Sequence, residues 1–207
     1  MEDYDDIIFV LVGPEEKRFS LHKSKLCSKS KFFKAACSKA WIKDRTVRQP
    51  HVSVVLFRHY CEWIYTGTIP TSRLTPESET EDKAAEQELF AGLYLLGDSL
   101  DDIQLRNLAI QRFCVCLEEG DQLPATTVFT HIWSSTPPGS LFRKQLIDIM
   151  VARILRDRFA ETIAEYPPDF VQELAVAAMF KAPLVTWKDT VGDNNKYLES
   201  EVAKDNT

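Results

Sequence analysis

The sequence predicts an α/β fold of the α+β type, in which a short β-hairpin precedes a long series of helices. Apolar, largely β-branched residues run from Ile7 to Val12, and an alternating pattern resumes at residues 19–21 after a Gly-Pro break. This arrangement predicts two strands joined by a turn. Beyond residue 30 the apolar residues recur mostly at the three- and four-residue spacing of amphipathic helices.

Local signals place the elements of the first half. Ser30 is a suitable cap for a short helix, and a short strand is expected at residues 46–48. Ser53 is expected to cap the next helix, which is apolar on most sides and should therefore be central. Gly67 can adopt the left-handed conformation that ends this helix.

The rest of the chain is predicted to be helical after a mobile polar loop at residues 70–83. Gly97 is expected to close the first helix after this loop, and Asp101 to cap the second. Further helices are expected at residues 128–133, 141–158 and 169–180.

Composition indicates the size of the protein and the cellular compartment in which we expect it. The chain has 207 residues, 44% of them hydrophobic, which is enough for one or two domains. Its five cysteines are an odd number and no secretory signal is recognisable, so we expect reduced thiols and an intracellular protein, cytoplasmic, nuclear or both. No apolar run approaches the roughly 20 residues of a membrane span, so no membrane partner is expected.

Charge is unevenly distributed. The net charge is −6, yet residues 17–48 contain eleven Lys and Arg against the single acid Asp44. We interpret this segment first as a solvated face that acids elsewhere in the fold neutralise, and second as a surface for an acidic partner. Direct nucleic-acid binding is not expected, because the chain as a whole is acidic and lacks a DNA-reading element.

Four separated blocks of sequence resemble the BTB/POZ domain. They are the strand hairpin, HKSKLCSKSKFFKAAC at residues 22–37, WIYTG at 63–67 and LYLLGDSL at 93–100. The resemblance covers residues 5–118. Residues 128–155, VFTHIWSSTPPGSLFRKQLIDIMVARIL, are similar to the helical extension behind BTB domains in many filamentous-fungal proteins.

This resemblance implies a small sheet packed on a helical cluster, used for self-association or for docking other proteins. It implies a BTB/POZ domain at residues 1–118 and a helical extension at 119–187, with a disordered tail at 188–207. The expected function is that of a non-catalytic interaction module, a scaffold or adaptor. The residues expected to carry the motif structurally are His22, Phe32, Phe33, Trp63, Tyr65 and Gly67. His22 is expected to turn inward and bond backbone where the strand meets the helix.

Two departures from the family concern its partners. Dimeric BTB domains often exchange an element that precedes the first common strand, but only six residues precede Ile7, so we expect a monomer or a weak homodimer. Asp6 and Lys23 correspond to a charge pair of those dimers and are expected to form an exposed ion pair.

The second departure concerns cullin ubiquitin ligases. BTB adaptors often engage cullins through a bulky apolar residue followed two positions later by glutamate, and here Trp41 is followed by Lys43. Asp44 lies one position too far, and a reversed charge disfavours docking. A role as cullin adaptor is therefore left open as an alternative and is not assumed.

No catalytic, cofactor or metal site is predicted. Cys114 and Cys116 would point about 200° apart on a helix and cannot chelate one ion. Cys27 with His22 is the only local pair resembling an activated thiol, and it lacks a third, orienting group. Two alternatives remain open, a transcriptional scaffold and a ligand site or enzyme between the two halves. The candidate residues for the latter are Arg143, Arg153, Arg156 and Tyr166, although we otherwise expect the arginines on a solvated helix face.

Overall fold

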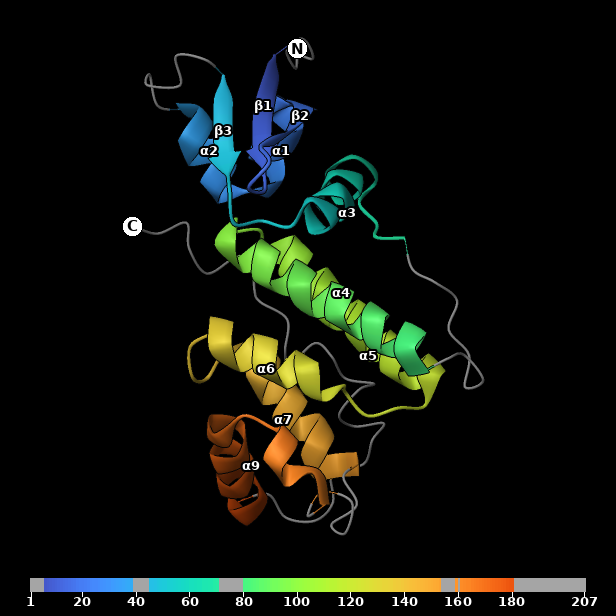
Figure 1. Cartoon of the computed structure of the whole chain (residues 1–207). Helices are drawn as coiled ribbons and strands as arrows, with labels where there is room; N and C mark the ends of the chain where they lie inside the picture. The colour runs from blue at the N-terminus through green and yellow to red at the C-terminus, as the bar shows by residue number, and fades with distance from the viewer. Residues whose placement is uncertain (1–5, 39–44, 71–79, 154–158, 160, 181–207) are drawn as a thin grey trace. The chain divides into compact units, whose positions relative to one another are not determined.

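The computed structural model of the chain describes residues 6–38, 45–70, 80–153, 159 and 161–180. The chain divides into two compact units, Met1–Thr71 with Leu96–Arg106 and Ser72–Leu95 with Asn107–Thr207. Figure 1 labels the elements of each unit. The domain boundary predicted at residue 118 does not coincide with this division into compact units. The predicted boundary stays a prediction.

A mixed three-stranded sheet forms the start of the first unit, in the order β2-β1-β3 (Figure 1). The central strand β1 (Ile7–Val12) pairs antiparallel with β2 (Lys17–His22) and parallel with β3 (Thr46–Gln49). The predicted hairpin and short strand are thus confirmed. Alternate side chains of β1 are buried, at Ile8, Val10 and Val12, so one face of the sheet contributes to the core.

Three helices complete most of this unit: α1 (Lys23–Lys29), α2 (Lys31–Ser38) and α3 (Val54–Thr66). The predicted cap at Ser30 is confirmed, because its Oγ accepts the backbone N–H of Phe33 at 3.0 Å. Gly67, with φ 71°, ends α3 in the left-handed conformation, as predicted. Ser53 occupies the N-cap position of α3, as predicted, but its hydroxyl makes no capping hydrogen bond.

Two long helices follow, α4 (Thr80–Ser99) and α5 (Ile103–Gly120). Helix α4 includes the last four residues of the predicted loop, while residues 71–79 lie outside the described part of the chain. Gly97 was expected to close α4, but the helix continues through it. The absence of a side chain at Gly97 instead allows Arg106 of α5 to approach α4 closely. A Cβ at Gly97 would lie 3.0 Å from Arg106 Cγ and 3.2 Å from the Arg106 backbone nitrogen.

The sequence suggested Asp101 as the cap of α5, but the cap is Asp102. Asp102 Oδ1 accepts the backbone N–H of Leu105 at 2.9 Å. Asp101 has a positive φ of 48°, which makes it the last turn residue before the helix. The cap therefore lies one position later than predicted, and the buried Asp102 carboxylate has a structural role.

The second unit contains parts of α4 and α5 together with the later helices. These are α6 (Thr126–Ser135), α7 (Leu141–Arg153), the 3₁₀ turn η1 (Ile163–Glu165) and α9 (Pro168–Phe180). Phe142 of α7 is fully buried and its ring centroid lies 4.9 Å from that of Tyr94 and 5.1 Å from that of Phe113. One core therefore joins α7 to α4 and α5.

A second aromatic cluster connects α6 to α9. Phe170 lies 4.4 Å from Phe129 and 5.0 Å from Trp133 between ring centroids, and Tyr166 lies 5.2 Å from Phe170. The helix predicted at 141–158 is described up to Arg153, and the predicted tail lies outside the described residues. Within the described part of the chain, no helix combines the length and apolarity needed to cross a membrane.

Candidate interaction surface

The first feature of the candidate surface is a three-residue charge cluster where β1 begins and β2 ends. The backbone N–H of Lys23 donates to the Asp6 carbonyl at 2.9 Å, which continues the strand pairing by one position. The Lys23 Nζ then lies 3.3 Å from Asp6 Oδ2, and Arg45 Nη1 lies 3.1 Å from Asp6 Oδ1. Asp6 and Lys23 thus form the expected pair, and Arg45 is a partner that the sequence did not indicate.

These side chains remain accessible to solvent, with exposed fractions of 32% for Asp6, 40% for Lys23 and 64% for Arg45. Exposed ion pairs contribute little to stability, about 0 to 1 kcal/mol each. One carboxylate faces two cations, so the cluster keeps an excess positive charge. Whether it serves as an interaction contact stays a prediction.

The sequence suggested that the His22 ring bonds backbone groups, but the structure pairs it with a side chain. Its Nδ1 atom lies 2.8 Å from the Tyr65 hydroxyl oxygen, which also accepts the His22 backbone N–H at 3.2 Å. The Tyr65 hydroxyl proton can then point to Nδ1, which leaves the imidazole proton on Nε2. His22 therefore ties the junction of β2 and α1 to α3.

The two adjacent phenylalanines take different roles. Phe33 is fully buried and stacks 6.4 Å from Tyr60 between ring centroids. Phe32 keeps 37% of its surface exposed and meets Phe33 edge-on at 5.2 Å. Phe33 thus anchors α2 to the core, whereas Phe32 extends that apolar contact to the surface.

Trp63 belongs to a buried polar arrangement beneath this surface. Its indole N–H donates to Asp102 Oδ2 at 3.0 Å, and Lys29 Nζ lies 4.5 Å above its ring. Burial raises the pKa of Asp102, while the N–H groups of Leu105 and Trp63 and the charge of Lys29 oppose this shift. Asp102 was missed by the sequence analysis, although two consecutive aspartates before a helical pattern signal a cap within one position.

The residues relevant to cullin docking are not part of the described surface. Trp41, Lys43 and Asp44 lie within residues 39–44, outside the described part of the chain. The expectation drawn from the Lys43 charge therefore stays a prediction.

Three of the five thiols offer little nucleophilic character. Burial raises the pKa of Cys61 and Cys116 to about 12, and burial together with the adjacent Cys27 raises that of Cys37 to about 12. Such thiols stay protonated near neutral pH. The Cys27 Sγ lies 3.7 Å from the Phe33 carbonyl oxygen, and the Nδ1 of His22 pairs with Tyr65. Among the described residues, no group of three or more His, Cys, Asp or Glu could hold a metal ion.

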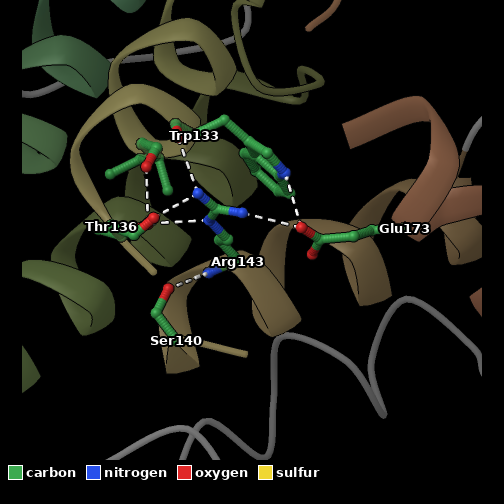
Figure 2. A network of polar contacts seen from close by, with 6 residues as sticks. Trp133, Thr136, Ser140, Arg143 and Glu173 are labelled. Atoms are coloured by element: carbon green, nitrogen blue, oxygen red, sulfur yellow. Dashed lines mark hydrogen bonds and ion pairs between the residues drawn. The ribbon is translucent and has the colours of Figure 1, made fainter. Parts of the chain in front are cut away.

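We expected Arg143, in the second unit, on a solvated helix face. The structure instead buries it within a polar network (Figure 2). Its Nε donates to Thr136 Oγ1 at 3.0 Å and its Nη1 to Glu173 Oε1 at 2.8 Å. Its Nη2 donates to the carbonyl oxygens of Trp133, at 2.7 Å, and Thr136. Four N–H groups of the guanidinium thus serve the joint between α6, α7 and α9.

The other residues considered for a ligand site also have structural contacts. Arg153 donates to Asp121 Oδ1 at 2.6 Å and to the Gln122 carbonyl at 3.0 Å. Tyr166 packs in the aromatic cluster of α6 and α9. Arg156 lies outside the described residues.

The first unit thus combines a mixed three-stranded sheet with the helices α1, α2 and α3, and several side chains of α2 are exposed. The family model of the BTB/POZ domain matches residues 2–102, so the N-terminal half of the chain is a BTB/POZ domain. BTB/POZ domains mediate protein–protein interactions. No curated protein matches the chain.

Proposed function

We propose that this protein is an adaptor or scaffold whose BTB/POZ domain binds other proteins and whose helical second half braces that domain. The observation that carries the proposal is the BTB/POZ match over residues 2–102. The exposed Asp6 cluster and the exposed rings of Phe32 and Tyr65 support it, because such side chains on a folded surface are typical contacts for another protein.

The proposal places the protein inside the cell, in the cytoplasm, the nucleus or both. All five cysteines are free thiols, which supports a reducing compartment. A weak homodimer is compatible with this role. Light scattering after size exclusion measures the self-association directly.

Sequential affinity purification tests the adaptor role. The tagged chain is purified at physiological salt with its bound proteins, and one captured protein is then used as the second handle. An adaptor should bring a third, different protein through both steps. Recovery of the chain alone or only of its own copies would contradict the proposal.

A variant at the Asp6 cluster makes this experiment specific. Asp6→Lys places three cations together and should release a partner that contacts this cluster, while leaving the buried core untouched. Glu62→Lys, also an exposed acid of the same unit, gives the same change in net charge and serves as the control. A partner lost from both variants alike would be bound by overall charge and not by this surface.

A further inference from the structure

Helix α2 presents an outer face whose only charges are positive. Five of its eight residues are exposed, namely Lys31, Phe32, Lys34, Ala35 and Ser38, and we call them the α2 face. Neither α1 nor α2 contains an acidic residue. The small Ala35 and Ser38 leave the lysines and the Phe32 ring accessible.

The positive charge of the α2 face is not neutralised by the described residues. Lys23 pairs with Asp6, and Lys29 donates to the neutral amide oxygen of Gln104 at 2.6 Å. Neither Lys31 nor Lys34 forms an ion pair with a carboxylate within the described part of the chain. Our first interpretation of the basic segment was neutralisation by acids elsewhere in the fold, and among the described residues such acids account for only part of it.

The stability of α2 does not explain these lysines either. Lys31 is the first residue of the helix and Lys34 the fourth, close to the positive end of the helix dipole. Acidic residues are favoured there and basic residues are disfavoured by a few tenths to about 1 kcal/mol. The lysines therefore oppose local stability, which indicates a role in contact with something outside the helix.

We propose that the α2 face docks an acidic segment of a partner protein, with carboxylates against Lys31 and Lys34 and an apolar side chain against Phe32. The inference rests on the proposed function and names the chemistry of the partner. A protein segment is favoured over nucleic acid or an anionic membrane because the net charge of the chain is −6. Nucleic acids and anionic membranes are extended polyanions, so the negative charge of the whole chain repels them. A short peptide meets mainly the local positive charge of the α2 face.

Fluorescence anisotropy with a defined probe tests the inference. The probe is a fluorescein-labelled peptide of four Asp-Glu-Leu repeats, added to the full chain at about 0.15 M ionic strength. The chain should bind it, and the matched Asn-Gln-Leu peptide should not bind. The Lys31→Glu/Lys34→Glu variant should weaken binding by about tenfold or more, since two exposed charge pairs are replaced by repulsion.

Two controls separate the α2 face from overall charge and from unfolding. Lys17→Glu/Arg58→Glu changes two exposed cations of the same unit outside α1 and α2, with an equal change in net charge. It should leave the affinity within about twofold of wild type. The α2 variant should melt at or above the wild-type temperature, because glutamates suit the start of a helix.

The contact with Phe32 has its own readout. Phe32→Ala should weaken peptide binding about threefold or more while leaving the slope of affinity against salt unchanged, because it removes apolar area and no charge. No change in affinity would remove Phe32 from the site.

Three outcomes would overturn the docking inference. They are no binding of the acidic peptide, an equal loss in both double variants, and tighter binding of single-stranded DNA or phosphatidylserine vesicles through the same lysines. A partner recovered by sequential purification that is lost from Asp6→Lys but retained by the α2 variant would leave the adaptor role standing and refute only the α2 face.

Discussion

At the scale of single residues, the Asp102 carboxylate is fully buried and still accepts two N–H groups. Burial raises its pKa despite these bonds. The sequence placed the cap at Asp101 because both aspartates suit an N-cap by composition. Only the backbone conformation distinguishes them, and that depends on the tight turn between α4 and α5.

The raised pKa of Asp102 predicts a pH-dependent stability. Between the ordinary carboxyl pKa and the raised value, the folded state holds more protons than the unfolded state, so stability falls as pH rises through this window. The free energy of unfolding of the wild type, minus that of Asp102→Asn, should therefore decrease from about pH 4 upward and then level off. Urea unfolding at a series of pH values measures it, and a difference that rises with pH would contradict the assignment.

Tyr65 supports a second prediction at this scale. Tyr65→Phe removes the hydroxyl that bonds both the Nδ1 and the backbone N–H of His22. Because these atoms are accessible to solvent, the loss should be modest, about 1 kcal/mol in urea unfolding. His22→Ala should cost little more once Tyr65 is phenylalanine, and fully additive losses would show that the two residues act independently.

At the scale of elements, the packing of α4 on α5 depends on Gly97. The sequence suggested a helix terminator, since a glycine near the end of an apolar stripe has that meaning most often. Its actual role arises from the neighbouring helix, because the backbone and side chain of Arg106 approach within the space of a Cβ. Such approaches depend on tertiary packing and cannot be derived from one stripe of residues.

Gly97→Ala should therefore destabilise the protein, by roughly 1 to 3 kcal/mol, because the added methyl group forces α4 and α5 apart. Gly120→Ala is the matched control, since its Cβ would lie 3.4 Å from the nearest atom of the Lys83 side chain and would meet no backbone atom there. The control should be neutral or slightly stabilising. Equal thermal shifts for the two variants would contradict the close-approach role of Gly97.

The contacts by which Arg143 connects α6, α7 and α9 could not be predicted from the sequence either. An arginine within a helical pattern is usually exposed, so the sequence did not reveal its buried contacts with Thr136 and Glu173. Arg143→Met should cost roughly 3 to 5 kcal/mol, because the buried carbonyl groups of Trp133 and Thr136 lose their donor. The Glu173 carboxylate loses its cation and keeps the Trp133 indole N–H, which donates to it at 3.1 Å. Faster hydrogen exchange across α9 would measure the loosening. Glu173→Gln, which keeps the acceptor, should have a smaller effect.

At the scale of the whole molecule, the motif blocks predicted the BTB/POZ domain because strands, caps and core positions are local signals. The sequence did not predict how the later helices share a core with α4 and α5. Phe142, beyond the predicted boundary at residue 118, fills the space between Tyr94 and Phe113. Such long-range packing leaves no periodic trace in either segment.

This shared core predicts that residues 1–118 expressed alone will be less stable than the full chain. Removing Phe142 uncovers the rings of Tyr94 and Phe113, which are buried in the full chain. The fragment should melt at a lower temperature and bind the dye ANS. A fragment as stable as the full chain and without dye binding would show that the helical extension is dispensable for folding.

The Asp6 carboxylate contacts Lys23 with one oxygen and Arg45 with the other. This arrangement is redundant, since either cation can be lost while the acid keeps a counter-charge. Single substitutions at Lys23 or Arg45 would then be tolerated, and a defect would emerge only in the double mutant. Surveys that change one position at a time would overlook these two cations, although they would detect a change at Asp6 itself.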